Sequence, residues 1–117
     1  DSPGRLRLLA EVDGELAGVC IVYSNNAQTR LRHRCCVDIT LYRKFWGLGM
    51  GTALLGEILT AAGTAGYEQA ELEVAAANAP AIGLYRKLGF EVTGTLPRAM
   101  KYADGTYADF LFMAKPL

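Results

Sequence analysis

The sequence lacks several features that would place a chain of 117 residues in a particular class of protein. It has no apolar run near the roughly 20 residues of a membrane-spanning helix, and no signal-peptide core. Its 12 basic and 12 acidic residues cancel, so net charge does not draw it to nucleic acid or to acidic membranes. It also has no linker, repeat or low-complexity tract. These absences favour one globular domain over residues 1–117, without a nucleic-acid or membrane partner.

Cysteine and histidine are scarce. The three cysteines are Cys20, Cys35 and Cys36, an odd number without a Cys-x-x-Cys spacing. This pattern disfavours a disulfide framework and a zinc site, so we expect no metal. Buried, reduced cysteines indicate a cytoplasmic protein. The only histidine, His33, is expected at the surface or facing a hairpin, at the start of a strand.

Glycine, by contrast, is concentrated between a strand-like run and a helical run. Gly47, Gly49 and Gly51 alternate within residues 45–52. A residue without a Cβ lets the backbone turn tightly and approach a ligand. The first N–H groups of the following helix lack internal partners and carry partial positive charge. The stretch therefore predicts a phosphate-binding loop, the alternative being a tight turn with no ligand.

Two common nucleotide-binding motifs do not fit this loop. A P-loop needs GxxxxGK[ST], and no lysine follows the glycines. A dinucleotide-binding fingerprint needs GxGxxG, whereas the loop reads GxGxG. The acidic residue expected about 20 residues further on would be Glu71, which lies inside an expected strand rather than at its end.

Hydrophobic periodicity predicts an α/β fold with the element order β-β-β-α-β-α-β-β. The first two strands form a hairpin around Asp13-Gly14. A first helix follows the glycine loop, and Gly63 and Gly66 end it. The expected strands cover residues 6–12, 16–23, 32–41, 70–74, 90–95 and 110–114.

The second helix begins at Asn78-Ala79-Pro80, because proline suits the first turn and asparagine can cap it. Either Asn78 or Ala79 is the cap, and Gly89 ends the helix.

Two segments resemble the signatures of the GNAT superfamily of acyl-CoA N-acyltransferases. Residues 46–51 resemble its pyrophosphate loop, [Q/R]xxGx[G/A], with Trp46 in the Gln/Arg position. Residues 78–90 resemble its segment N-x-x-A-x-x-L-Y-x-x-x-G-F. The resemblance covers residues 5–117 and implies a mixed, mostly antiparallel sheet with splayed central strands. It also implies that the family's first strand and the two helices after it are absent from this chain.

The resemblance implies that acetyl-CoA is the cosubstrate. Backbone groups of Ile39 and Leu41 would pair with the pantetheine arm, while the glycine loop holds the pyrophosphate. Asn78 would contact the arm, cap its helix, or do both. Arg43 and Lys44 would add charge toward the 3′-phosphate, or form a solvated basic turn. The implied cofactor-binding residues are Ile39, Leu41, Trp46, Gly47, Leu48, Gly49, Met50, Gly51, Thr52, Asn78 and Tyr85.

The resemblance also implies the catalytic residues. Tyr85 occupies the position of the general acid that meets the leaving thiolate. A phenol with a pKa of about 10 is protonated at neutral pH, but it is a weaker acid than a thiol at about 8.5. Hydrogen bonding to the thiolate is therefore as credible as full proton transfer. Asp38 and Glu73 lie on the strands that flank the cofactor in the family, and each is a candidate general base acting through water.

The resemblance implies an enzyme that transfers acetyl to a primary amine by direct attack. Residues 94–113 resemble members that acylate free amino acids and protein N-termini, and Arg98 there is either a carboxylate partner or a surface arginine. A small amine is a third acceptor class. The resemblance implies that much of the acceptor site is absent from this chain, and a second copy in a homodimer is one way to supply it. The alternatives are a CoA-binding module without turnover, a truncated inactive member, and a structural protein with no ligand.

Overall fold

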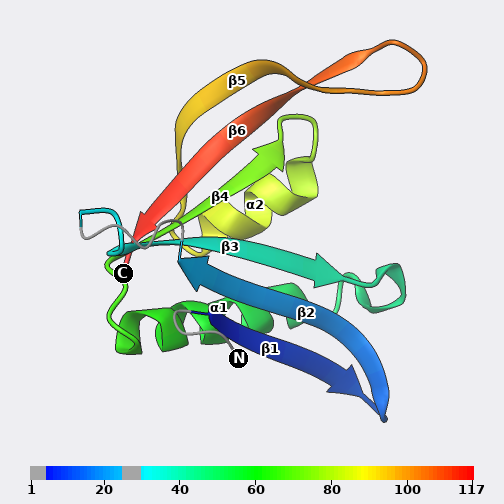
Figure 1. The fold of residues 1–117 in the computed structure, drawn as a ribbon. Helices are drawn as coiled ribbons and strands as arrows, with labels where there is room; N and C mark the ends of the chain where they lie inside the picture. The colour runs from blue at the N-terminus through cyan, green and yellow to red at the C-terminus, as the bar shows by residue number, and fades with distance from the viewer. Residues whose placement is uncertain (1–4, 25–29) are drawn as a thin grey trace. The chain divides into compact units, whose positions relative to one another are not determined.

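The computed structural model describes residues 5–24 and 30–117 (Figure 1). Its elements follow the predicted order β-β-β-α-β-α-β-β, with one 3-10 turn, η1 (Arg43–Phe45), before the first helix. The six strands belong to one sheet, in the order β1-β2-β3-β4-β6-β5. The predicted α/β class with a mostly antiparallel sheet is therefore confirmed. By its contacts the chain divides into two compact units, the first ending at Ala70 and also holding Pro116–Leu117, the second covering Glu71–Lys115. One domain over residues 1–117 and splayed central strands remain predictions.

The first unit contains an antiparallel meander of β1 (Arg5–Val12), β2 (Glu15–Ser24) and β3 (Arg34–Leu41). Asp13 and Gly14 join β1 to β2 with φ angles of 52° and 80°. Positive φ at both central residues gives a turn whose twist matches that of the flanking strands, and this is why Asp-Gly favours hairpins. The predicted hairpin is confirmed.

Helix α1 (Met50–Thr64) packs on these three strands (Figure 1). Its buried residues recur at helical spacing, as predicted, and they are Gly51, Leu54, Leu55, Ile58, Leu59 and Ala62. The strands contribute the buried side chains of Ala17, Cys20, Val22, Cys35 and Val37. Each fully buried Leu or Ile contributes about 1.5–3 kcal/mol. This core holds the end of β3 and the start of α1, and so positions the glycine loop between them.

The second unit contains most of β4 (Gln69–Ala75) and all of α2 (Ala79–Lys87), β5 (Glu91–Lys101) and β6 (Tyr107–Pro116). Leu72, Val74, Phe90 and Met113 are its buried hydrophobic residues. β5 and β6 pair antiparallel as far as Lys101 and Tyr107. The predicted strands 90–95 and 110–114 are therefore too short. Pro97 lies where the register shifts, between Leu96 and Met100, as is usual for a proline within a sheet.

Cys20 and Cys35 are buried, as expected, whereas Cys36 is half-buried; all three are free thiols. His33 is exposed immediately before β3, and its carbonyl oxygen accepts the N–H of Glu68 at 2.8 Å. Among residues 5–24 and 30–117, no helix is long and apolar enough to cross a membrane. The same residues contain no group of side chains that could hold a metal ion.

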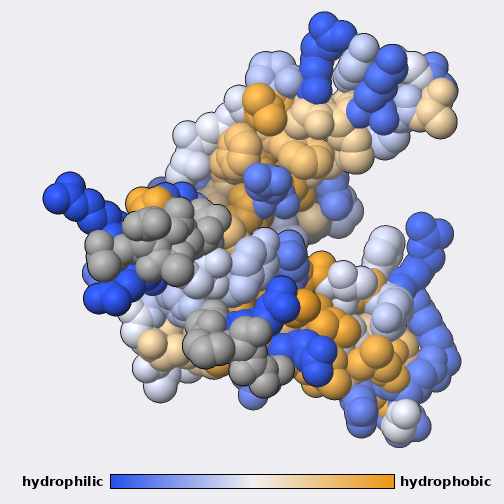
Figure 2. Space-filling model, viewed as in Figure 1, coloured by the Kyte–Doolittle hydropathy of each residue, from blue (hydrophilic) through white to orange (hydrophobic). Residues whose placement is uncertain are grey.

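Hydrophobic side chains also reach the surface in both units (Figure 2). In the first unit, Trp46 and Leu48 of the glycine loop are 58% and 66% exposed. In the second, the exposed members belong to the β5–β6 hairpin, among them Leu96, Tyr102 and Tyr107. The large exposure of the loop side chains shows that backbone geometry, rather than side-chain burial, shapes this segment.

Candidate functional site

The glycine loop is the turn from η1 into α1. Gly47 and Gly49 have φ angles of 79° and 76°, a left-handed conformation that costs other residues roughly 1–2 kcal/mol. A Cβ added at either position would meet nothing within 4 Å. The glycines are thus required by backbone conformation, not by crowding within the protein. The open space beside them leaves the loop backbone accessible to a ligand.

The start of α1 is uncapped by side chains. Gly49 is the N-cap residue, it makes no side-chain cap bond, and the first turn contains no acidic residue. The N–H groups of Met50, Gly51 and Thr52 belong to that first turn, where no intrahelical acceptor exists. A helix start with free N–H groups and partial positive charge favours an anion. The loop and helix start therefore fit the predicted pyrophosphate.

The backbone groups at the end of β3 point alternately toward β2 and away from it. Tyr42 donates its N–H to the carbonyl oxygen of Ala17, 2.9 Å away at the start of β2. Along an antiparallel strand, the N–H and C=O groups of successive residues point to alternate sides. Because those of Tyr42 point to β2, those of Ile39 and Leu41 point to the side of β3 away from β2. There, the carbonyl oxygen of Leu41 accepts the indole Nε1–H of Trp46 at 2.7 Å.

The two basic residues before the loop have different environments. Lys44 Nζ lies 2.9 and 3.1 Å from the carboxylate oxygens of Glu15, at the start of β2. The Arg43 guanidinium carbon lies 5.3 Å from the centre of the Trp46 ring, and within the described chain it has no acidic partner in salt-bridge range. Of these two cations, Lys44 is thus paired with a carboxylate, whereas Arg43 lies over an aromatic ring.

In the second unit, Asn78 caps α2. Its Oδ1 accepts the N–H of Ala81 at 3.3 Å, and Pro80 lies in the first turn. Of the two capping candidates, Asn78 is therefore the correct one. The side-chain acceptor serves the helix, while the NH₂ group of the same side chain is a donor that a cap does not need.

Tyr85 lies half-buried in α2, and its orientation is constrained by Phe90. The two rings meet edge to face, with centroids 6.0 Å apart and an interplanar angle of 63°. The N–H of Phe90 also donates to the Tyr85 carbonyl oxygen at 3.0 Å. Because Phe90 is 1% exposed, it forms a fixed support for the phenol ring.

The two candidate bases lie at the surfaces of their strands. Asp38 is exposed on β3, opposite Ile21 of β2. Glu73 is exposed on β4, between buried Leu72 and Val74. The Asp38 charge acts on Cys20: burial, and then this carboxylate, raise the pKa of the thiol to about 12.

Arg98 has a conformation that the sequence did not predict. Its φ is 54°, unusual for a residue with a Cβ. Its N–H donates to Asp109 Oδ1 at 2.9 Å, and its guanidinium carbon lies 4.1 Å from the centre of the Tyr107 ring. The side chain is exposed and is held in place by these neighbours.

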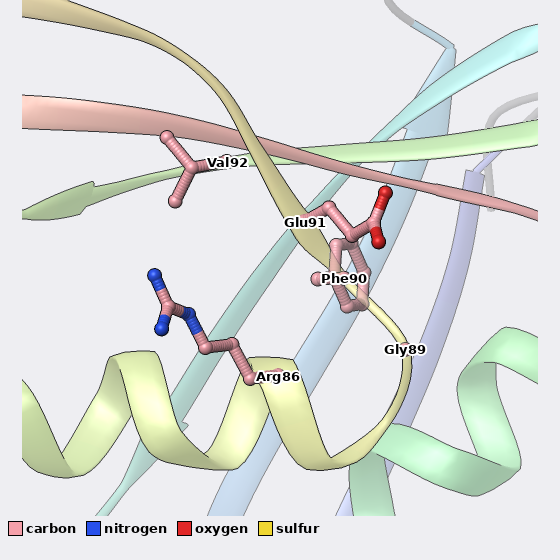
Figure 3. A pocket seen from close by; sticks show the side chains of 5 residues that line it. All are labelled: Arg86, Gly89, Phe90, Glu91 and Val92. Atoms are coloured by element: carbon pink, nitrogen blue, oxygen red, sulfur yellow. The ribbon is translucent and has the colours of Figure 1, made fainter.

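A pocket of about 480 Å³ lies beside the end of α2 (Figure 3). It is lined by Arg86, Gly89, Phe90, Glu91 and Val92. The Arg86 side chain extends from α2 on the side of Val92, as Figure 3 shows. Gly89 and Phe90 end the second motif, but none of the predicted catalytic or cofactor-binding residues lines this pocket.

The predicted residues thus form two groups. Ile39, Leu41, Trp46 and the glycine loop lie in the first unit, and Glu73, Asn78 and Tyr85 lie in the second. The sequence motifs indicated both groups. They did not indicate the Trp46–Leu41 bond or the Lys44–Glu15 pair, because those pairs are set by the path of the folded chain.

Comparison with known proteins identifies close relatives. Residues 1–90 match the acetyltransferase (GNAT) family. An N-alpha-acetyltransferase of Sulfurisphaera tokodaii is 38% identical over 117 residues, covering 93% of this chain and 68% of the relative. An L-amino acid N-acetyltransferase of Escherichia coli is 33% identical over 120 residues, covering 98% of this chain and 70% of the relative.

Solved structures of GNAT acetyltransferases have a similar fold. A GNAT-family acetyltransferase from Streptococcus pneumoniae superposes with a TM-score of 0.93 at 29% identity, covering 99% of this chain and 69% of that one. A phosphinothricin acetyltransferase from Sinorhizobium meliloti, solved in complex with AcCoA, has a TM-score of 0.90 at 28% identity and covers 97% of this chain and 62% of that one.

Proposed function

Because the chain belongs to the GNAT family of acetyltransferases, we propose that it transfers the acetyl group of acetyl-CoA to the α-amine of an amino acid or a peptide. The observation that carries the proposal is the glycine loop, with two left-handed glycines before an uncapped helix start. Acetyl transfer from acetyl-CoA to an amine follows from the family and its relatives. The choice of an α-amine is the finer step.

The loop and the strand before it hold the donor in the proposed mechanism. N–H groups at the start of α1 bind the pyrophosphate. Backbone groups of Ile39 and Leu41, on the edge of β3 away from β2, align the pantetheine arm, whose amides resemble a peptide strand. The NH₂ group of Asn78 donates to the same arm. Acetyl-CoA supplies an activated acetyl group as a thioester.

Two kinds of side chain serve the chemistry. The Tyr85 hydroxyl donates to the sulfur as it leaves, and Phe90 fixes the ring in that role. Asp38 or Glu73 takes the proton of the attacking amine through a water molecule. Both carboxylates are exposed within their units, so a water can reach either of them.

The acceptor class follows from proton chemistry and from the relatives. An α-amine with a pKa near 7.8 is partly neutral at pH 7, whereas a lysine amine near 10.4 is neutral in fewer than about one molecule in a thousand. A site with only exposed carboxylates as bases therefore suits an α-amine better. The relatives named above act, by their names, on α-amines or on L-amino acids. Arg98, held over Tyr107, is a candidate partner for the carboxylate of a free amino acid.

Location and assembly are further proposals. Free, mostly buried cysteines support a reducing compartment, and we place the protein in the cytoplasm. A homodimer remains a proposal as well, with sedimentation of the purified chain as its test.

An amine panel tests the activity. Thiol release from acetyl-CoA is measured with three kinds of acceptor. They are L-amino acids, a lysine-containing peptide with a free N-terminus, and the same peptide with its N-terminus acetylated, so that only the lysine amine is free. We expect release with the first two acceptors and none above background with the third. CoA binding without release from any amine would support a binding module instead, and the absence of CoA binding at millimolar concentration would exclude both functions.

Tyr85→Phe tests the proposed acid. Loss of the hydroxyl removes a hydrogen bond to a developing thiolate, so we expect kcat to fall about tenfold or more. The KM for acetyl-CoA should stay within about twofold, because the interaction forms mainly in the transition state. A rate within twofold of the wild-type rate would show that Tyr85 does not have this role.

A further inference from the structure

Trp46 lies immediately before the first glycine of the loop and contacts both the Leu41 carbonyl and the Arg43 guanidinium. Its Nε1–H bonds to the Leu41 carbonyl oxygen at 2.7 Å, and its ring faces the Arg43 guanidinium at 5.3 Å. The next residue, Gly47, is the first left-handed glycine of the loop. Although the indole is 58% exposed, both its donor and its ring face are engaged.

We propose that Trp46 is a positioning residue that holds the Leu41 carbonyl and the Arg43 guanidinium at the loop, and that Arg43, not Lys44, is the side-chain cation for a phosphate of the donor. This inference rests on the proposed function, since it concerns how the same donor is bound. The shared chemistry is a phosphate group, either the 3′-phosphate or the pyrophosphate.

The assignment of Arg43 follows from the neighbours of the two cations. Lys44 is held by both carboxylate oxygens of Glu15, so a phosphate would have to compete with an ion pair already formed. An aromatic face attracts the guanidinium without neutralising its charge. A guanidinium has several N–H donors in a planar fork that suits phosphate oxygens, and those of Arg43 are not engaged by a carboxylate in the described chain.

The assignment of Trp46 follows from its two contacts. A carbonyl oxygen has two acceptor positions, and the indole occupies one of those on Leu41. The bond fixes the direction of the carbonyl at the strand edge and leaves one position for an N–H of the pantetheine arm. The same bond holds the indole plane, and this plane in turn holds Arg43.

Calorimetric titration of the intact chain with CoA and with 3′-dephospho-CoA tests the proposal. We expect Arg43→Gln to weaken CoA binding about tenfold, the scale of one charge-assisted hydrogen bond. Lys44→Gln should change it by less than about twofold. If the Arg43→Gln loss disappears with dephospho-CoA, the 3′-phosphate is the partner; if the loss persists, the partner is the pyrophosphate.

Variants of Trp46 test the positioning role. Trp46→Leu removes both the donor and the ring, and should weaken CoA binding about as much as Arg43→Gln. The double variant should be little weaker than either single one, because Trp46 acts largely through Arg43. Trp46→Phe keeps a ring but loses the N–H, and should fall between wild type and Trp46→Leu. Leu9→Ala, another exposed apolar truncation in the first unit, is the matched control and should bind as wild type does.

The outcomes separate the two levels of inference. If the wild-type chain does not bind CoA, the proposed function fails. If it binds CoA while Lys44→Gln weakens binding more than Arg43→Gln, only the assignment of Arg43 is wrong. If losses from Trp46→Leu and Arg43→Gln add fully in the double variant, Trp46 does not act through Arg43.

Discussion

Cys20 is a much weaker acid in the folded chain than a free cysteine is. It lies fully buried on β2, where burial and the Asp38 charge raise the pKa of its thiol from 9.0 to about 12. Between these two pH values the folded chain keeps the proton and the unfolded chain loses it. Because the folded state then binds more protons, the free energy of unfolding falls as the pH rises through this window.

Urea unfolding of the wild type and of Cys20→Ala measures this effect. From about pH 8 to about pH 10.5 the wild-type midpoint should fall more steeply than that of Cys20→Ala, which has no thiol to ionise. The alanine variant is expected to be less stable at neutral pH because it leaves a small cavity. If the midpoints of the two proteins fall equally with pH, ionisation of the Cys20 thiol is not the cause of the lower stability at alkaline pH.

At the scale of residues, the sequence was informative where the chemistry is local. Asn78 was correctly proposed as a cap because a cap acts on N–H groups two or three residues away. The partner of Trp46 was not predicted, because an indole five residues beyond Leu41 reaches it only after η1 has turned the chain. The backbone of Arg98 was also unpredicted, since its φ depends on a register shift and on Asp109 eleven residues away.

At the scale of elements, the start of α2 has two roles that substitutions can separate. Asn78→Ala removes the acceptor for the Ala81 N–H and should lower the free energy of unfolding by about 1 kcal/mol. Asn78→Asp keeps an acceptor oxygen but removes the NH₂ donor, so stability should stay within about 0.5 kcal/mol. Urea unfolding and CoA titration measure both effects. If Asn78→Asp binds CoA as tightly as wild type does, the side chain serves the helix alone.

Substitution by alanine should have opposite effects on stability at two glycines, one at the start of α1 and one in its interior. Gly49→Ala forces a Cβ into a backbone with φ of 76° and should cost about 1–2 kcal/mol of stability, although the space there is open. Gly56→Ala, in the interior of α1 and equally uncrowded, should gain about 0.5–1 kcal/mol. Urea unfolding compares the two. Equal stabilities would mean that the loop can adopt another conformation at little cost.

The elements themselves were well predicted from the sequence, because hydrophobic periodicity and turn residues are local signals. The helix over Met50–Thr64 buries the apolar positions that its spacing indicated. The strands of the β5–β6 hairpin were predicted too short, although Pro97 lies inside β5 rather than at its end. Pairing with β6 continues beyond Pro97, from Met100 opposite Ala108 to the turn, and such pairing between strands is not visible in local sequence patterns.

At the scale of the whole molecule, CoA should stabilise the folded chain. A ligand that binds only the folded state adds about 2.7 kcal/mol at a hundredfold excess over its Kd. For a chain of this size the midpoint temperature should therefore rise by about 10 °C. Differential scanning calorimetry at several CoA concentrations measures the rise, with adenosine as a control without the phosphates. No concentration dependence would contradict binding to the folded state.

The fold class and the donor were predictable from the sequence because both depend on short motifs in a fixed order. The acceptor was not, because its recognition depends on side chains brought together through space. From the sequence, Arg98 was either a partner for a substrate carboxylate or a surface arginine. The structure adds that its guanidinium is held over Tyr107, and this makes it a preorganised candidate rather than a mobile surface charge.

The Asp13-Gly14 turn has a consequence for the order of folding. It brings Val12 and Glu15 together across two residues, so closing this loop loses little chain entropy. Hairpins of this kind form within about 1–10 μs, before long-range pairings. We therefore expect β1 and β2 to pair early and to present an apolar surface on which α1 condenses. In pulse-labelling hydrogen exchange during refolding, amides of β2 should gain protection before those of β5.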